Sequence, residues 1–77
     1  MVFVQPRNII GKKISQIRKK KGVTQEDLAA RLNVQGINID RPMISKIENQ
    51  TREILDFEIL GVAKALGVSI EELFKEI

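Results

Sequence analysis

The apolar positions of this chain recur at helical spacing in short blocks, each bounded by glycine or by polar residues that cap helices. Ile10, Ile14 and Ile17 are spaced at i, i+4 and i+7, which puts them on one face of a helix. Asn8 would cap that helix and Gly22 would end it. Further helices are expected over residues 24–36, 40–49, 56–67 and 69–75, with Asp56 as the cap of the fourth helix and Leu55 on its inner side. The pattern predicts an all-α fold of five helices.

The second block begins with a strong helix start. Thr24 can accept a hydrogen bond from a first-turn backbone N–H while Asp27, three residues on, reaches back to it. Leu28, Ala29 and Leu32 then line one face. A small alanine on that face lets a second helix pack closely.

The third block offers that second helix. Asp40 should cap it, and Pro42 is tolerated in the first turn because N–H groups there have no partner within the helix. Ile44 and Ile47 face inward, which leaves Ser45, Lys46 and Asn49 outward. Two short helices of this kind form a helix-turn-helix, whose second helix lies in the major groove of DNA.

Four motifs together resemble the phage-repressor-like helix-turn-helix family, which contains the lambdoid repressors, Cro and many small bacterial regulators. They are Arg18, Thr24-Gln25-Glu26-Asp27-Leu28-Ala29, Ile44-Ser45-Lys46-Ile47-Glu48-Asn49 and Ala63-Lys64-Ala65-Leu66-Gly67-Val68-Ser69. The resemblance runs from about Ile10 to Phe74. It implies a compact five-helix, lambda-repressor-like DNA-binding domain.

The turn between the two helices is longer than the family pattern. We expect the first helix to gain about one turn and to end at Gly36 in a left-handed conformation. Ile37 would then fold back on Leu32, and Ile39 would take the core position of the usual apolar turn residue.

The resemblance also implies functional residues. Base edges would be read by Arg41, Pro42, Met43, Ser45 and Lys46. Phosphates would be held by Gln25, Asn49, Gln50, Thr51 and Arg52. Arg18 and Glu48 match the family's ion pair between the first helix and the recognition helix, a structural role. The alternative is that the outward residues are ordinary exposed polar side chains and that Asn49 merely caps its helix. Gln50 stands where the family commonly has glycine.

Composition limits the chemistry. The 77 residues include neither cysteine nor histidine, so zinc sites and the common nucleophile–base pairs are not available. We therefore expect no enzymatic activity, no metal and no cofactor. Residues 1–7 read as an extended lead-in and residues 8–77 as one domain. No apolar run approaches a membrane span and no leader is visible, so a cytoplasmic protein is expected.

Charge is unevenly distributed around the net value of +3. Residues 1–23 carry seven cations and no acid, whereas residues 53–77 carry six acids against Lys64 and Lys75. A basic end and an acidic end suggest a dipolar molecule that orients toward a polyanion. Alternatively, Lys19, Lys20 and Lys21 only complement the carboxyl end of their helix.

The two chain ends carry more apolar side chains than one small core needs. They are residues 2–4, Phe57, Leu60, Leu73, Phe74 and Ile77. They either close the open end of the core or form a homodimer surface, and a two-fold dimer reads paired half-sites.

The sequence predicts a sequence-specific regulator that binds double-stranded DNA, acting as a repressor by occupying an operator. One alternative is an antitoxin-type member of the same fold that neutralises a toxin protein. Another is a protein-interaction adaptor that has lost DNA binding. The sequence leaves open a homodimer and a protein partner, whether toxin or effector.

Overall fold

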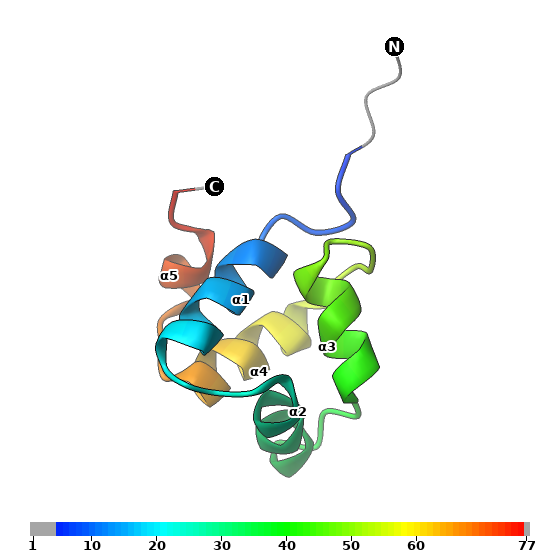
Figure 1. The fold of residues 1–77 in the computed structure, drawn as a ribbon, viewed down its shortest axis with the longest axis vertical. Helices are drawn as coiled ribbons and strands as arrows, with labels where there is room; N and C mark the ends of the chain where they lie inside the picture. Colours follow the sequence, from blue (N-terminus) through cyan, green and yellow to red (C-terminus); the bar gives the residue numbers. More distant parts are fainter. Residues whose placement is uncertain (1–4, 77) are drawn as a thin grey trace.

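The computed structural model describes residues 5–76, which form five α-helices and no strand (Figure 1). The helices are α1 (Gly11–Lys20), α2 (Gln25–Val34), α3 (Arg41–Glu48), α4 (Asp56–Leu66) and α5 (Ile70–Phe74). In Figure 1, α1 lies between α3 and α5, and α4 runs behind them. The all-α architecture expected from the sequence is confirmed.

The helix pair α2–α3 begins as its cap residues predict. The Thr24 hydroxyl accepts a hydrogen bond from the backbone N–H of Asp27 at 3.0 Å, and the Asp27 carboxylate accepts one from the N–H of Thr24 at 3.2 Å. At the start of α3, the Asp40 carboxylate accepts the N–H of Met43 at 2.9 Å. These bonds satisfy N–H groups that have no partner within the helix, and so they fix where each helix starts.

The longer turn between α2 and α3 takes the expected form. Gly36 has φ +82°, a conformation that costs glycine little, and the N–H of Ile37 donates to the Leu32 carbonyl at 3.0 Å. Ile37 is buried and packs against Gly61 of α4, and a Cβ added at Gly61 would collide with the Ile37 side chain. The extra residues therefore form part of the core.

One expected helix cap is wrong. The structure starts α4 at Asp56, and the cap position is held by Leu55, whose N–H donates to Glu58 at 2.9 Å. The Glu58 carboxylate reaches back three residues, while the Asp56 carboxylate accepts only the N–H of the adjacent Phe57. Asn8 does make the expected side-chain bond at the start of α1, since it accepts the N–H of Gly11, although Ile10 holds the cap position.

A single hydrophobic core fills the space between the five helices. It draws on every helix and on the α2–α3 turn, and its fully buried members include Ile10, Ile14, Leu28, Leu32, Ile39, Ile44 and Leu73. Leu73 was expected among the surplus apolar residues and instead lies in the core, whereas Leu55, expected inside, is about half exposed. Residues 2–4 and Ile77 lie outside the described residues.

No helix in residues 5–76 combines the length and the apolar character that crossing a bilayer requires.

Candidate nucleic-acid interface

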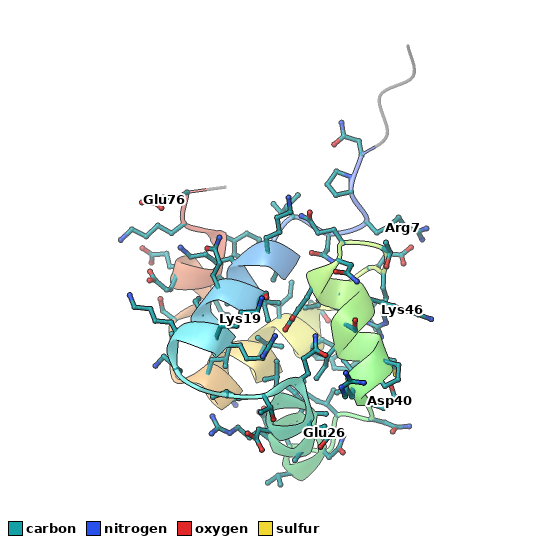
Figure 2. The ribbon with its side chains drawn as sticks, viewed as in Figure 1. Arg7, Lys19, Glu26, Asp40, Lys46 and Glu76 are labelled. Atoms are coloured by element: carbon teal, nitrogen blue, oxygen red, sulfur yellow. The ribbon has the colours of Figure 1, made fainter. Side chains whose placement is uncertain are left out.

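The polar residues of α3 and of its carboxyl end lie on one side of the helix. We call this side the outer face of α3, and it comprises Arg41, Pro42, Ser45, Lys46 and Asn49. Each helical residue turns about 100° around the axis, so these five span an arc of roughly 140°. All are exposed except Ser45, which is half-buried. In Figure 2, Lys46 projects from α3 on the side away from α1. The outer face is a set of donors and acceptors on a helix of eight residues.

Met43 does not share that face. It lies next to the buried side of α3, where it is half-buried and packed against the core. The sequence grouped it with the base-contacting residues, but the structure does not bring it together with them.

The buried side of α3 is tied to α1 by an ion pair. Arg18 donates through Nε to Glu48 Oε2 at 2.7 Å and through Nη2 to Oε1 at 2.9 Å. The two side chains are only 9% and 6% exposed, and the third Arg18 bond goes to the Val23 carbonyl at 2.9 Å. A bidentate pair in this setting fixes orientation as well as distance. It holds α3 at a set angle to α1.

Gln25 extends this network to α2. Its Nε2 donates to Glu48 Oε1 at 3.0 Å, so the first residue of α2 and the last of α3 share one carboxylate. Burial by itself would raise the pKa of Glu48, but hydrogen bonds from Arg18 and Gln25 outweigh it and lower that pKa. The hydrogen bonds that Arg18 donates to Glu48 raise the pKa of Arg18. The network is therefore charged at neutral pH.

An open groove of about 530 Å³ lies at the N-terminus of α2. Gln25 lines it together with Lys19, with Arg41 from the start of α3 and with the acid Glu26. The N-terminus of a helix carries partial positive charge and free N–H groups, and the cations of Lys19 and Arg41 outnumber the carboxylate of Glu26, so the groove suits an anion such as a phosphate. Lys19 was not predicted to line this groove, because only the tertiary structure brings the end of α1 and the start of α3 together beside the N-terminus of α2.

The carboxyl end of α3 is closed by a left-handed turn. Gln50 has φ +63°, and the N–H of Thr51 donates to the Lys46 carbonyl at 3.0 Å. Gln50 thus adopts the conformation that glycine commonly takes at this point, and the turn is kept despite the different residue. Asn49 is exposed just before it, and the Thr51 hydroxyl donates to the Lys46 carbonyl at 3.2 Å.

Besides Gln25 and Thr51, whose bonds to Glu48 and to the Lys46 carbonyl are given above, two more of the predicted phosphate-contacting side chains are bonded within the protein. Gln50 Nε2 donates to the Asn8 carbonyl at 3.0 Å. Arg52 forms a bidentate pair with Glu58, with both N–O distances 3.0 Å. Burial alone would raise the pKa of Glu58, but its bonds from Arg52 and from the N–H of Leu55 lower it. The pair fastens the segment after α3 to α4.

Sequence reasoning missed Glu58, which is 3% exposed. The available signal was its place three residues after Leu55, where a glutamate can cap a helix start. Asn8 was assigned only a cap, although its Nδ2 also reaches the Ile47 and Arg52 carbonyls at 2.9 and 2.8 Å. The long-range contacts of Asn8 have no signature in the sequence.

Comparison with known proteins identifies the fold and its relatives. The helix-turn-helix family model matches residues 14–73. The chain is 34% identical over 68 residues to Control protein C.MunI from a Mycoplasma species, covering 87% of this chain and 85% of that protein.

Two solved structures are similar to the whole fold. The restriction-modification controller protein C.AhdI from Aeromonas hydrophila has a TM-score of 0.74 and 32% identity, over 84% of this chain and 91% of that one. The clp gene regulator ClgR from C. glutamicum has a TM-score of 0.78 and 24% identity, over 92% and 86%. The second likeness bears on the fold alone.

Proposed function

This chain belongs to the helix-turn-helix family, and we propose on that premise that it is a sequence-specific regulator that binds double-stranded DNA with α3 in the major groove. The observation that carries the proposal is the outer face of α3, which stands clear of the core while Arg18 and Glu48 hold the helix from behind. Its mode of action is repression by occupation of an operator. Such a regulator works where the DNA is, in the cytoplasm of a bacterium.

Base reading is assigned to the outer face of α3. The guanidinium of Arg41 and the ammonium of Lys46 suit guanine O6 and N7, and Ser45 can donate or accept. The ring of Pro42 offers an apolar contact to a thymine methyl. Met43 is left to the core, because its side chain packs there.

Phosphate binding is assigned to the two ends of the helix pair. Gln25 and the N-terminus of α2 would hold one phosphate, Gln25 through the amide groups that its one bond to Glu48 does not use, with Lys19 lining the same groove. Asn49 and Thr51 would hold a second at the far end of α3. We assign Gln50 and Arg52 a structural role instead, because their side chains tie the segment after α3 to Asn8 and, through the bidentate pair with Glu58, to α4.

A homodimer completes the proposal. Phe57 and Leu60 of α4 and Phe74 of α5 are between 39% and 53% exposed, on two helices that contribute nothing to the outer face of α3. Apolar side chains so exposed favour association with a second copy. A two-fold dimer would read two half-sites separated by roughly 34 Å, one helical turn of DNA.

The regulated genes are proposed from the relatives. Two proteins more than 30% identical to this chain are called control proteins, one of them of a restriction-modification system. We propose that this chain controls genes of the same kind.

Selection of bound duplexes from a random DNA pool tests the proposal. The expected result is one enriched, pseudo-palindromic site with a half-site spacing of about one turn. Sedimentation should show a dimer bound to the selected duplex, whereas the Phe57→Glu variant should bind a single half-site as a monomer. Co-purification of a tightly bound second protein would favour the antitoxin alternative, whose members bind DNA as well. Absence of any salt-sensitive duplex binding would favour the adaptor.

A further inference from the structure

The side chain of Asn8 uses its hydrogen-bonding groups on three separate parts of the chain. Its Nδ2 donates to the Ile47 carbonyl in the last turn of α3 and to the Arg52 carbonyl beyond that helix. Its Oδ1 accepts the first N–H of α1, from Gly11, at 2.7 Å. The residue is 7% exposed, so these bonds are shielded from water. A buried amide with both its N–H groups bonded is a rigid connector.

The backbones of α1 and α3 touch at this connector. A Cβ at Gly11 would lie 2.0 Å from the Ile47 carbonyl oxygen, so the two helices approach closely at the carbonyl that Asn8 binds. The last turn of α3 is thus pressed against the start of α1 and is bonded at the same carbonyl oxygen to Asn8, just before that helix. Sliding α3 along α1 would break the bond or create a clash.

A second pair of bonds secures the same corner. The N–H of Arg7 donates to the Gln50 carbonyl at 3.1 Å, and Gln50 Nε2 returns a bond to the Asn8 carbonyl at 3.0 Å. These bonds hold the backbone at residues 7 and 8, from which the Asn8 side chain projects. They place the Asn8 side chain where it can reach α3.

Arg18 holds α3 from within α1, and Asn8 holds it from the segment that precedes α1. Both attachments are made at the carboxyl end of α3, to the neighbouring residues Glu48 and Ile47, and Asn8 also binds the Arg52 carbonyl beyond that end. Two separate parts of the chain therefore fix where this end of α3 lies. The attached residues, Ile47 and Glu48, lie between Lys46 and Asn49 of the outer face.

We propose that Asn8 is a positioning residue for DNA reading, which acts through the Ile47 and Arg52 carbonyls to aim the outer face of α3. The proposal rests on the function proposed above and adds a residue that does not itself touch DNA. Its consequence is that changes at Asn8 reduce sequence discrimination more than they reduce binding to DNA in general.

Two variants separate this role from the cap. Asn8→Ala removes every side-chain bond. Asn8→Ser keeps an oxygen that can accept the N–H of Gly11, since serine is a good cap, but one hydroxyl cannot donate to two carbonyls. Both leave the net charge unchanged. A matched control is Gln35→Ala. It removes the hydrogen bond of 2.9 Å from the side-chain amide of Gln35 to the Gly61 carbonyl, which joins the end of α2 to α4.

The measurement is the affinity ratio between the selected duplex and a scrambled one, at a temperature where melting curves show each variant folded. In both Asn8 variants the affinity ratio should fall about tenfold, a loss as large as that caused by one wrong base pair. Their affinity for the scrambled duplex should be nearly unchanged. Asn8→Ser should recover part of the stability lost by Asn8→Ala without recovering the ratio. Gln35→Ala should lower the melting temperature and keep the ratio.

Residual dipolar couplings of the α3 amides, measured without DNA, give an independent readout of helix direction. They should change relative to α4 in both Asn8 variants and not in Gln35→Ala. Unchanged couplings and an unchanged ratio would overturn the proposal and leave Asn8 a structural residue. An equal loss of ratio in Gln35→Ala would overturn it too. If wild type selects no duplex, the proposed function fails, and the couplings alone then decide whether Asn8 aims α3.

Discussion

Gly11→Ala is expected to destabilise the domain, although alanine is the better helix former. The new Cβ would lie 2.0 Å from the Ile47 carbonyl oxygen and 2.9 Å from Asn8 Oδ1. Since a Cβ does not come within 3.0 Å of such an atom, the carbonyl has to retreat by about 1 Å. That movement stretches its 2.9 Å bond from Asn8 beyond hydrogen-bonding distance.

The size of the stability loss follows from two costs and one gain. Overpacking against a backbone atom costs about 1–3 kcal/mol. Loss of the hydrogen bond adds about 1 kcal/mol. The helix propensity of alanine returns about 1 kcal/mol. The net loss is about 1–3 kcal/mol, and in a domain of this size each kcal/mol lowers the melting temperature by about 4–8 °C.

Thermal melts of Gly11→Ala and Gly61→Ala provide the assay and its control. Gly61 lies in the middle of α4, whereas Gly11 is the first residue of α1, and a Cβ added at Gly61 would meet Ile37 Cδ1 at 2.3 Å. That atom ends a flexible side chain, which can rotate away, whereas a carbonyl inside a helix cannot. Gly11→Ala should therefore lose more stability than Gly61→Ala. A Gly11→Ala protein that melts at or above the wild-type temperature would refute the reasoning.

Three further outcomes are expected. In a double-mutant cycle, Arg18→Ala and Glu48→Ala should each cost on the order of 3 kcal/mol of unfolding free energy, because either single change leaves a buried charge unpaired. The double mutant should cost much less than the sum of the two. Simple additivity would show that the two residues do not interact. The lowered pKa values of Glu48 and Glu58 mean that their contribution to stability is full above about pH 4.5, the ordinary value, and is lost as pH falls through the lower folded pKa. Melts from pH 7 to pH 3 should show that loss, and it should be smaller in Glu58→Gln. Arg52→Ala should lower stability and leave the salt dependence of DNA binding nearly unchanged; a slope shallower by about one unit would mean that Arg52 neutralises a phosphate after all.

The fold was largely predictable because its decisive signals are local. The cap of Thr24 with Asp27 and the left-handed Gly36 followed by Ile37 are both found as expected. Each depends on residues within five positions of one another, so spacing alone identifies them. Asp56 was misplaced because a glutamate two residues on competes for the same helix start.

The family resemblance supplied the Arg18–Glu48 pair, but the other supports of α3 were harder to predict, since they join residues far apart in the chain. Asn8 bonds to residues 39 and 44 positions away, and nothing in the spacing marks it. Gln50 takes a left-handed conformation without being glycine, because its side chain and carbonyl are held by the segment at Arg7 and Asn8. The position of Met43 at the edge of the core, apart from the outer face of α3, was not predicted, because which arc of a short helix faces outward is set by tertiary packing.

The central claim, that α3 reads base sequence, is tested most directly by comparing Arg41→Ala and Lys46→Ala with Lys64→Ala. All three remove one exposed cation, but Lys64 lies on α4. Affinities for the selected duplex and for single-base variants of it should show that the α3 changes each lose about 1–3 kcal/mol and relax discrimination at particular bases. Lys64→Ala should keep full discrimination. If the Arg41 and Lys46 variants keep it as well, α3 is not the reading helix.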